Sequence, residues 1–421
     1  MWSHLNQEES QAVKNSTPSI VIVGGGHAGA ALCSELANAE LGANVHLVCR
    51  EARLPYQRPP LSKTYLKSDQ EDVQVHRGAA WFADAGITVH LGDSAIAIDR
   101  SGKVLTLASG KTLTYDWLVL ATGTSARWIG ALPERLENVA VLRTSDDAGR
   151  MRMLLPAVDK VTILGGGFIG LEIAATARML GKEVVVLDAA ERLLSRSVSE
   201  ALSAHVLDAH RAVGIDVRLG VTVDGFEHDN KRLLSLNVNG ASQPVELLVL
   251  GIGAVATTEL AEGAGVLCND GVLVDAHLRS SDDSILAIGD VARFPLFGSG
   301  QLYRLESVQN ANDQARIALA TIQGRLTAYR SLPWFWSDQG AVRLQMAGLV
   351  PTTASTIYRR VGASSSSFSL LHYVDDRLVC VESVNAPADH LAARKLIEAG
   401  ISPEPEQAVA GAVPLKQFLN R

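Results

Sequence analysis

Two sets of glycines have the spacing that brings a polypeptide chain close to the pyrophosphate of a dinucleotide. The first set is Gly24, Gly26 and Gly29, and the second set is Gly165, Gly167 and Gly170. Residues without a Cβ allow the tight turn of the G-x-G-x-x-G pattern and place a helix N-terminus against a phosphate. One copy is weak evidence, because glycine-rich turns are common. Two copies separated by 141 residues indicate a protein that holds one dinucleotide permanently and exchanges another.

An acidic residue follows each glycine set, where the ribose of a nucleotide would need a hydrogen-bond acceptor. Glu51 comes 22 residues after Gly29, and Asp188 follows the second set. A carboxylate accepts hydrogen bonds from the ribose hydroxyls of NADH and repels the 2′-phosphate of NADPH. Asp188 therefore predicts NADH as the coenzyme. The nearby Arg192 and Arg196 leave room for NADPH, unless they only cover a solvated helix face.

Short buried strands and the helices that follow them are the elements that must position these residues. Each glycine set lies between an apolar run typical of a parallel strand and a helical segment, and a second apolar run precedes each acid. The expected strands are 20–23, 45–48, 161–164 and 184–187, and the expected helices are 28–39 and 171–180. This repeated order predicts an α/β fold with two Rossmann-like dinucleotide-binding domains.

Length and composition argue against several other classes of protein. A chain of 421 residues is long enough for two or three domains. A formal net charge of −7 and a pI near 5.9 argue against nucleic acid as the main partner. Glycines interrupt the most apolar segments, so no membrane span is expected. Residues 1–17 lack the basic and apolar regions of a signal peptide and predict a disordered leader on a cytoplasmic protein.

The cysteines are scattered along the sequence at Cys33, Cys49, Cys268 and Cys380. None forms a C-x-x-C or C-x-x-x-x-C pair, which argues against the redox-active dithiol of disulfide reductases with a similar layout. Neither the cysteines nor the dispersed histidines have metal-ligand spacing, so no metal site is expected.

A proline-rich segment, Leu54 to Lys63, follows Glu51 at the point where a loop would cross a bound cofactor. Its three prolines predict a stiff, extended surface segment, neither strand nor helix. The segment presents Arg58 and Lys63, and cations suit a pyrophosphate or a reducible ring that gains negative charge. A plain proline-rich linker is the alternative interpretation.

Glu51 followed by L-P-Y-x-R-P-P-L-S-K resembles the FAD-dependent, putidaredoxin reductase-like ferredoxin reductases of bacterial cytochrome P-450 and aromatic-ring dioxygenase systems. The resemblance covers the chain from about residue 19 onward. In that family the lysine matching Lys63 lies beside the flavin N5 edge and pairs with the glutamate matching Glu172, and the arginine matching Arg58 contacts the FAD. The resemblance implies a glutathione-reductase-like layout with an additional C-terminal α+β domain.

Further motifs of the same family set the expected domain boundaries. An apolar strand closing on Ala121-Thr122-Gly123 resembles the passage from the FAD domain to the NAD domain. Ser284 to Asp290 resembles the second FAD fingerprint, and Arg304 to Ala311 resembles a helix start that Ser307 caps. The implied domains are a discontinuous FAD domain (18–127 and 252–327), an NAD domain (128–251) and a C-terminal interface domain (328–421).

The C-terminal region changes to short expected strands from about residue 327 and ends in a helix over 388–399. Its opening, Pro333 to Gln339, matches the family pattern P-W-[FY]-W-S-D-Q. The tryptophan matching Trp336 lies near the flavin and the ferredoxin surface in relatives, which implies a place at the electron exit. This domain often takes part in dimers in relatives, so a homodimer is an open option.

Carried over residue by residue, the resemblance implies Lys63, Glu172 and Trp336 as catalytic residues. Phe168 is expected to cover the flavin until nicotinamide displaces it, or simply to pack in the core. The residues expected at FAD are Gly24, Gly26, His27, Ala28, Gly29, Glu51, Arg58, Lys63, Ala121, Thr122, Gly123, Arg143, Gly289, Asp290, Glu306, Ser307, Val308 and Trp336. Those expected at NAD are Gly165, Gly167, Phe168, Ile169, Gly170, Glu172, Asp188, Arg196 and Gly253.

The resulting hypothesis is an NADH-dependent ferredoxin reductase. Hydride passes from NADH to FAD, and single electrons then pass to a [2Fe-2S] ferredoxin that supplies a monooxygenase or an aromatic-ring dioxygenase. Two alternatives share the same cofactor residues: reduction of rubredoxin, a quinone or monodehydroascorbate, and a regulatory flavoprotein that senses NADH. Two departures from the family pattern, the missing proline in 123–127 and Val255 to Thr257 in place of a proline-asparagine turn, concern loop geometry only.

Overall fold

Contacts within the chain divide it into two units, each built around a parallel sheet. The computed structural model describes residues 17–134, 136–362, 364–410 and 413–420. The first unit comprises the described residues up to 56 together with 75–124 and 256–330. The second comprises 57–74, 125–255 and the residues from 331 onward. The predicted leader lies outside the described residues, except for Thr17.

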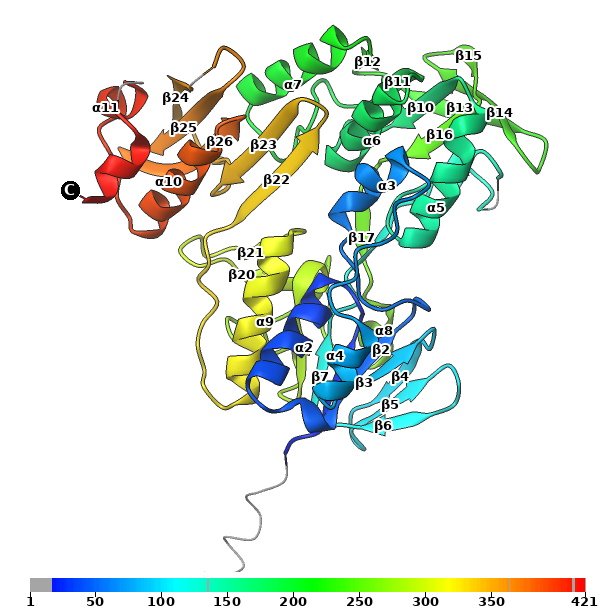
Figure 1. Cartoon of the computed structure of the whole chain (residues 1–421), viewed down its shortest axis with the longest axis vertical. Helices are drawn as coiled ribbons and strands as arrows, with labels where there is room; N and C mark the ends of the chain where they lie inside the picture. The colour runs from blue at the N-terminus through cyan, green and yellow to red at the C-terminus, as the bar shows by residue number, and fades with distance from the viewer. Residues whose placement is uncertain (1–16, 135, 363, 411–412, 421) are drawn as a thin grey trace, which may run out of the picture. The chain divides into compact units, whose positions relative to one another are not determined.

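A five-stranded parallel sheet forms the core of the first unit, in the order β19-β7-β1-β2-β3. These strands are β1 (Ile20–Val23), β2 (Val45–Cys49), β3 (Thr88–Leu91), β7 (Trp117–Leu120) and β19 (Ile285–Ala287). Every residue of β1 is buried, as expected of a strand covered on both faces. Figure 1 shows two helices of this unit, α2 (His27–Asn38) and α9 (Val308–Ile322), lying side by side.

Smaller elements complete the first unit. Two three-stranded sheets have the orders β4-β5-β6 and β18-β20-β21. The remaining elements are 3-10 helix η1 (Gly42–Asn44), α4 (Ala79–Asp84), β4 (Ala95–Asp99), β5 (Val104–Leu107), β6 (Thr112–Thr114), α8 (Glu259–Gly263), β18 (Val272–Leu273), η4 (Gly289–Val291), β20 (Ala292–Pro295) and β21 (Leu302–Tyr303). Two short strands, β8 (Thr124–Ala126) and β17 (Ala254–Ala256), pair with each other where the chain passes between units.

The second unit contains a parallel sheet in the order β12-β11-β10-β16-β9, in which four strands repeat the arrangement of the first sheet. Its strands are β9 (Val139–Ala140), β10 (Lys160–Leu164), β11 (Glu183–Leu187), β12 (Asp216–Arg218) and β16 (Leu247–Leu250). Numbered from the strand before the glycine loop, four strands of both sheets run 3-2-1-4, as in Rossmann folds. The strand beyond the fourth comes later in the chain in the first sheet (β19) and before β10 in the second (β9). The prediction of two Rossmann-like domains is therefore confirmed.

Helices and a small antiparallel sheet complete this part of the second unit. The helices are η2 (Pro59–Ser62), α3 (Thr64–Lys67), α5 (Ser145–Leu154), η3 (Leu155–Ala157), α6 (Phe168–Met179) and α7 (Glu200–Ala212). The antiparallel sheet consists of β13 (Val223–His228), β14 (Leu233–Val238) and β15 (Ala241–Pro244).

The C-terminal part of the second unit is α+β, as predicted. Five antiparallel strands have the order β22-β23-β26-β25-β24, and apolar side chains of α10 and of the last residues pack against them. The elements are β22 (Trp334–Gln339), β23 (Val342–Ala347), β24 (Thr356–Val361), β25 (Phe368–Val374), β26 (Arg377–Val384), α10 (Pro387–Glu398), α11 (Pro405–Val409) and η5 (Leu415–Asn420).

One local prediction is wrong. Residues 54–63 are not a uniformly extended surface segment, because Pro59 to Ser62 form the 3-10 helix η2, and Leu61 and Ser62 are buried. The ring of proline fixes φ near the helical value, so proline is compatible with the first turn of a helix. The buried turn brings Ser62 and Lys63 against the rest of the second unit.

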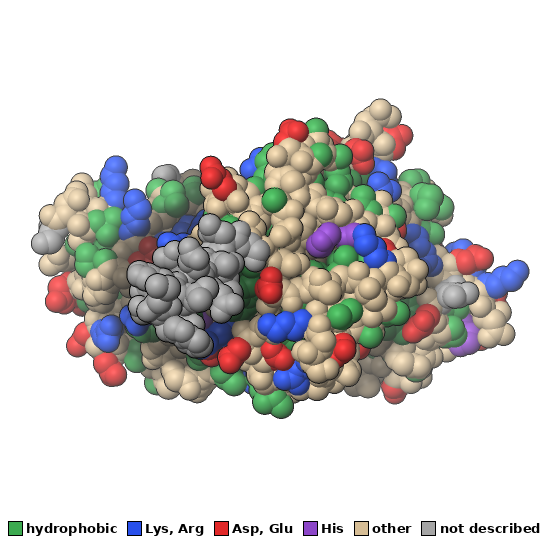
Figure 2. Space-filling model, turned by 90° about the horizontal axis from the view of Figure 1, so that it is seen from below, with side chains coloured by type: hydrophobic (Ala, Val, Ile, Leu, Met, Phe, Trp, Pro, Cys, Tyr) green, Lys and Arg blue, Asp and Glu red, His purple; other side chains and the backbone are tan. Residues whose placement is uncertain are grey.

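The described surface shows mixed charge. Figure 2 shows acidic and basic side chains interspersed over the visible face. Within the described residues, no helix combines the length and apolar character needed to span a bilayer.

Candidate functional site

The first glycine loop connects β1 to α2 in the first unit. Gly24 has a φ of +123°, and a Cβ at this position would lie 2.1 Å from the carbonyl oxygen of Ala121. A Cβ at Gly29 would lie 2.0 Å from the carbonyl oxygen of Gly24. At Gly26, in contrast, a Cβ would meet no described atom within 4 Å. Side chains are thus excluded where strand and helix approach each other, and the middle of the loop is open to a ligand.

Other predicted FAD residues of the first unit lie at the ends of neighbouring elements. Glu51 follows β2 and accepts a hydrogen bond from the hydroxyl of Tyr56. Asp290 lies in η4, directly after β19. Ser307 caps α9 as predicted, because its Oγ accepts from the backbone N–H of Asn310 at 3.0 Å. The N-termini of α2 and α9 can both direct N–H groups toward an anion or a carbonyl oxygen.

Some predicted FAD residues have structural partners of their own. The Arg304 guanidinium forms ion pairs with Glu306 at 2.6 Å and with Asp270 at 3.3 Å. The Thr122 hydroxyl donates to the carbonyl oxygen of Thr257 at 2.7 Å, and this places the Ala-Thr-Gly turn against the returning chain. The first unit therefore contains Gly24, Gly26, His27, Ala28, Gly29, Glu51, Ala121, Thr122, Gly123, Gly289, Asp290, Glu306, Ser307 and Val308, whereas Arg58, Lys63, Arg143 and Trp336 belong to the second unit.

The second glycine loop, between β10 and α6, repeats the geometry of the first. Gly165 has a φ of +110°, and a Cβ there would lie 2.4 Å from the carbonyl oxygen of Gly251. A Cβ at Gly170 would lie 2.3 Å from the carbonyl oxygen of Gly165. The next residue after the N-cap Gly167 is Phe168, and Ile169 is 47% exposed in the first turn of α6. An exposed apolar side chain beside an uncapped helix start is suited to contact a nucleotide.

Asp188 lies at the end of β11 and is tied to this loop. Its Oδ2 accepts from the backbone N–H of Gly166 at 2.6 Å, and its Oδ1 accepts from that of Ala190 at 2.9 Å. Of the two nearby arginines, Arg196 is exposed and its guanidinium lies beside Gly253. Two predicted NAD residues from separate parts of the sequence are thus neighbours.

The alternative interpretation of Arg192 and Arg196, a solvated helix face, is wrong. Both arginines lie in turns between β11 and α7, before the helix begins at Glu200. The Arg192 guanidinium donates to the carbonyl oxygens of Ser195 and Val198 at 2.7 and 2.9 Å, so it holds this connection together.

The predicted ion pair between Lys63 and Glu172 is confirmed. Lys63 Nζ lies 2.6 Å from Glu172 Oε2, and the exposed fractions of the two side chains are 19% and 6%. Both residues lie in the second unit, although their expected domains differ. An ion pair with this little solvent costs more to desolvate than a surface pair and is correspondingly more sensitive to the loss of either partner.

Two serines that the sequence analysis does not single out complete the environment of Glu172. Ser62 Oγ donates to Oε2 at 2.6 Å, and Ser337 Oγ donates to Oε1 at 2.7 Å. Each carboxylate oxygen therefore has a hydroxyl donor. Ser337 comes from β22, 165 residues from Glu172, and only its place within the P-W-F-W-S-D-Q motif marks it in the sequence.

Strand β22 presents alternate residues to opposite faces, as strands do. Phe335 and Ser337 face α6, because the rings of Phe335 and Phe168 are 4.4 Å apart and Ser337 contacts Glu172. Trp334 and Trp336 lie together on the other face, with ring centroids 5.7 Å apart. Trp336, the predicted electron exit, therefore lies on one face of β22, and the predicted NAD residues Phe168 and Glu172 of α6 contact the other face.

The predicted arginines Arg58 and Arg143 lie together in the second unit. The Arg58 guanidinium donates to the carbonyl oxygen of Arg143. Arg143 directly precedes Thr144, which forms a capping box with Asp147 at the start of α5. The contact fixes the proline-rich segment against the beginning of α5.

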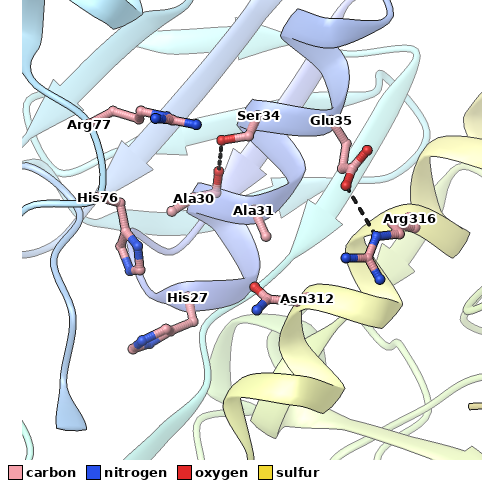
Figure 3. Close-up of a pocket in the computed structure, with 9 residues that line it drawn as sticks. All are labelled: His27, Ala30, Ala31, Ser34, Glu35, His76, Arg77, Asn312 and Arg316. Atoms are coloured by element: carbon pink, nitrogen blue, oxygen red, sulfur yellow. Dashed lines mark hydrogen bonds and ion pairs between the residues drawn. The ribbon is translucent and has the colours of Figure 1, made fainter.

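A surface pocket of about 320 Å³ lies in the first unit between α2, α9 and the chain at 76–77. Figure 3 shows Arg77 and Arg316 on two sides of it, with Arg316 directed toward Glu35. The rings of His27 and His76 meet edge to face, 4.7 Å apart. Both arginines are exposed, and one of them, Arg77, lies over the Trp81 ring. The pocket therefore combines exposed positive charge with a position next to the first glycine loop.

The four cysteines of the sequence all lie in the described residues, and all are free. Burial raises the pKa of Cys33 and of Cys380 well above the usual thiol value. Burial, with the nearby Glu51 carboxylate, raises the pKa of Cys49 to about 12. Such thiols are poor nucleophiles near neutral pH. Among the described residues, no three histidine, cysteine or acidic side chains are grouped as a metal site would require.

Both glycine loops fit a dinucleotide. Gly26 and Gly167 are the N-cap residues of α2 and α6 and have no side chains, so the first N–H groups of both helices are available to a pyrophosphate. A carboxylate follows the second strand of each sheet, as a ribose requires.

Comparison with known proteins agrees with this geometry. Residues 18–315 match the family model described as pyridine nucleotide-disulphide oxidoreductase, and residues 334–419 match one described as reductase C-terminal. Rhodocoxin reductase of Rhodococcus erythropolis is 39% identical over 405 residues, which are 96% of this chain and 95% of that protein. Terpredoxin reductase of a Pseudomonas species is 41% identical over 404 residues, covering 95% and 98% of the two proteins.

Solved structures give the same result. A ferredoxin reductase from Rhodopseudomonas palustris matches with a TM-score of 0.91 and 38% identity, covering 95% of this chain and 99% of that one. Putidaredoxin reductase, solved in a covalent complex with putidaredoxin, matches with a TM-score of 0.91 and 34% identity, covering 96% and 99%. The chain is therefore an oxidoreductase that uses a flavin and a nicotinamide dinucleotide, and it belongs to the pyridine nucleotide-disulphide oxidoreductase family, among the putidaredoxin reductase-like ferredoxin reductases.

Proposed function

We propose that this protein is an NADH-dependent ferredoxin reductase that holds FAD in its first glycine loop, binds NADH in its second, and reduces a [2Fe-2S] ferredoxin. The observation that carries the proposal is the repeated glycine-loop geometry, on a chain whose relatives of nearly equal length are ferredoxin reductases. The ferredoxin would in turn supply a monooxygenase or an aromatic-ring dioxygenase in the cytoplasm.

FAD is proposed to bind through the first unit. The N–H groups at the start of α2 would neutralise part of the pyrophosphate charge, Glu51 would accept from a ribose hydroxyl, and Asp290 would accept from the ribityl chain. Ser307 caps the N-terminus of α9, whose free N–H groups would then be available to the flavin. When bound, FAD supplies the redox chemistry by accepting two electrons from NADH and releasing them one at a time.

NADH is proposed as the coenzyme because the carboxylate of Asp188 is held in one position. Hydrogen bonds from Gly166 and Ala190 hold both of its oxygens at the end of β11. A held carboxylate can accept from the ribose hydroxyls and repels a 2′-phosphate. Arg196, exposed beside Gly253, would be the residue that tolerates some NADPH.

Lys63 is proposed to hold positive charge toward the flavin. Its ammonium group pairs with Glu172, which is in turn held by Ser62 and Ser337. A preorganised cation in a poorly solvated site stabilises developing negative charge more strongly than one in water. Glu172 orients the lysine, and the two serines keep the carboxylate in place.

The electron acceptor is proposed to be an acidic [2Fe-2S] ferredoxin. The exposed Arg77 and Arg316 at the pocket beside α2 support this proposal, because complementary charge speeds encounter and fixes orientation. Arg316 pairs with Asp313 at 2.6 Å and with Glu35 at 3.4 Å in the free protein. Arg77 therefore carries most of the exposed positive charge, and Arg316 would have to exchange these partners on docking.

Steady-state reduction of a panel of [2Fe-2S] ferredoxins with NADH tests the proposal. At least one ferredoxin should turn over at rates typical of enzymes, on the order of 1–10³ s⁻¹, and the rate should fall as ionic strength rises. A rubredoxin, a quinone and monodehydroascorbate serve as comparison acceptors. Rapid reduction of one of these, with slow rates for every ferredoxin, would identify a different acceptor. Slow rates with every acceptor would favour an NADH-sensing role.

A further inference from the structure

The connection from β11 to α7, residues 189–198, packs back on the second glycine loop. The backbone N–H of Leu194 donates to the carbonyl oxygen of Gly166 at 3.0 Å. Leu193 is fully buried, and a Cβ at Gly166 would lie 2.4 Å from its side chain. Leu194 has a backbone φ of 53°, a value that residues other than glycine rarely adopt. The connection therefore supports the loop in a conformation that has to be imposed by its surroundings.

Helix α7 holds this connection from its other end. Ser203 Oγ, which is buried, donates to the carbonyl oxygen of Leu193 at 2.7 Å. Ser199 is the N-cap of α7, and its Oγ accepts from the backbone N–H of Leu202 at 3.2 Å. The position of the α7 N-terminus thus determines where Leu193 and Leu194 lie against Gly166.

A residue of the C-terminal sheet fixes that N-terminus. Glu382 on β26 is fully buried, and its Oε1 accepts from the backbone N–H of Ser199 at 2.9 Å. Its Oε2 lies 2.9 Å from Nε2 of His372 on β25, which is also fully buried. A buried carboxylate is costly unless both oxygens are paired. Here one oxygen is paired within the C-terminal sheet and the other with the start of a nicotinamide-domain helix.

Comparison with α5 shows what Glu382 replaces. At α5 the third residue of the helix, Asp147, accepts from the backbone N–H of the N-cap Thr144 and so completes a capping box. At α7 the corresponding residue is Leu202, whose side chain cannot accept a hydrogen bond. The acceptor for the N-cap residue of α7 comes instead from a strand 183 residues further along the chain.

We infer that Glu382 is a positioning residue for the coenzyme, through which the C-terminal domain sets the affinity of the second glycine loop for NAD⁺ and NADH. It acts through Ser199, the connection 189–198 and Gly166, and it does not touch the coenzyme itself. The inference rests on the proposed function of the second glycine loop.

The test compares variants of the flavin-loaded protein by calorimetric titration with NAD⁺ and by hydrogen–deuterium exchange of residues 189–199. Glu382→Met keeps the approximate length of the side chain and removes both acceptor oxygens. It should weaken NAD⁺ binding about tenfold, the effect of losing one hydrogen bond to a charged group, and speed exchange in the connection. The KM for NADH should rise with kcat changed by less than about twofold. Glu382→Gln retains an acceptor for Ser199 and should restore most of the affinity.

A matched control lies on the same strand. Ser383 is fully buried and shares a hydrogen bond with Ser369, 3.0 Å away. Ser383→Ala removes a buried hydrogen bond from the same sheet without touching Ser199, so NAD⁺ binding and exchange in 189–199 should be unchanged. Equal weakening in Ser383→Ala would attribute the effect to general loosening of the sheet and overturn the inference.

A second pair of variants avoids any change in the C-terminal sheet, in case Glu382→Met does not fold. Ser199 has a φ of −65°, the value that proline requires. Ser199→Ala removes the capping hydroxyl but keeps the backbone N–H that donates to Glu382. Ser199→Pro removes both the hydroxyl and this N–H. Weaker NAD⁺ binding and faster exchange in Ser199→Pro than in Ser199→Ala support the inference, and equal values overturn it. If the unmodified protein fails to bind NAD⁺, the proposed function fails, and the exchange measurement still shows whether Glu382 anchors the connection.

Discussion

At both glycine loops the first glycine adopts a positive φ, +123° at Gly24 and +110° at Gly165. The surroundings of the following glycine differ. A Cβ at Gly25 would lie 2.6 Å from Sγ of Cys49, at the buried end of a core strand. A Cβ at Gly166 would meet the side chains of Leu193 and Asp188. Both loops are held by the neighbouring strand, through Gly24 N–H to the carbonyl oxygen of Val48 and Gly165 N–H to that of Leu187, both at 2.8 Å. The second loop is supported in addition by a separate connection that has anchors of its own.

This difference fits the two proposed tasks. Support from a sheet strand changes only when the unit unfolds, which suits a cofactor that stays bound through many turnovers. Support from the connection 189–198 depends on hydrogen bonds at Gly166, Ser203 and Glu382, each of which can weaken locally. A site of that kind suits a coenzyme that has to leave in every catalytic cycle.

Replacing the first glycine of either loop should give the largest effects. One variant should lose flavin binding and the other NAD⁺ binding. In Gly24→Ala the new Cβ would collide with the carbonyl oxygen of Ala121, and the positive φ disfavours any L side chain. The Kd for FAD should rise by about tenfold or more, which corresponds to roughly 1.4 kcal/mol or more, and the purified variant should contain less flavin than the parent. Gly165→Ala should keep its flavin and lose NAD⁺ binding.

Acid release of flavin and calorimetric titration with NAD⁺ measure these two outcomes separately. Circular dichroism shows whether each variant is folded. Normal flavin content in Gly24→Ala, or flavin loss in Gly165→Ala, would reverse or abolish the assignment of the two loops.

The elements around both loops could be predicted from the sequence, because the signals are local. A β-branched run before three spaced glycines predicts the strand, the turn and the helix, and β1 and β10 follow these signals closely. The pairing of Lys63 with Glu172 was available only through the family resemblance. Their serine partners were not, since Ser337 approaches Glu172 from 165 residues away and serines of this kind are common at any surface.

The errors have a similar origin. The three prolines of segment 54–63 indicate restricted φ but do not distinguish an extended segment from a 3-10 turn, and burial of Leu61 and Ser62 decides between them. Arg192 lies on no helix face, because the hydrogen bonds of its guanidinium to Ser195 and Val198 stabilise a turn. The role of Glu382 depends on a contact with a backbone N–H, which no side-chain pattern reveals.

A change at Lys63 should have the next largest effect. Lys63→Met keeps the length and removes the charge, so flavin content should be normal while flavin reduction by NADH slows by about tenfold or more, with roughly 1.4 kcal/mol for each factor of ten. Rapid mixing under anaerobic conditions measures this rate.

Lys160 supplies the matched control. It pairs with Glu183 at 2.9 Å, but the side chains are 32% and 68% exposed. Exposed pairs contribute roughly 0–1 kcal/mol to stability, so NADH should reduce the flavin of Lys160→Met at the same rate as that of the parent protein. An unchanged rate in Lys63→Met would make its ion pair equivalent to this surface pair.

Removal of Asp188 should have a smaller effect, confined to the second loop. Asp188→Ala removes the hydrogen-bond acceptor for the ribose hydroxyls and for the N–H of Gly166. The KM for NADH should therefore rise by about tenfold while kcat changes little. The preference over NADPH should narrow, because the repulsion of the 2′-phosphate is lost. Asp216→Ala is the control, since Asp216 is exposed on the neighbouring β12 and pairs with Arg218. A parent enzyme that already prefers NADPH would show that Arg196 outweighs the carboxylate.

The smallest effect is expected from modification of the cysteines, even though Cys49 lies directly behind the first loop. The family as a whole is named for disulfide chemistry, but here burial holds the pKa of Cys49 at about 12 and that of Cys268 at about 11. The thiolate is the reactive form, so at pH 8 only a small fraction of either residue can react. Burial raises the pKa of Cys33 and Cys380 as well. Iodoacetamide should therefore leave the NADH-driven reduction of ferredoxin unchanged, whether it is added before or after reduction by NADH.

The urea-unfolded protein is the control for this experiment, because all four cysteines should then be alkylated, as intact mass would show. The folded protein should gain a label slowly and first at Cys268, which is the least buried of the four. If alkylation does abolish activity, the flavin content shows which part of the protein is affected. Inactivation together with loss of flavin would mean that alkylated Cys49 displaces Gly25 and opens the first loop. Inactivation with flavin retained, and only after reduction by NADH, would mean that reduction exposes a reactive thiol, and a disulfide would then have to be part of the electron path.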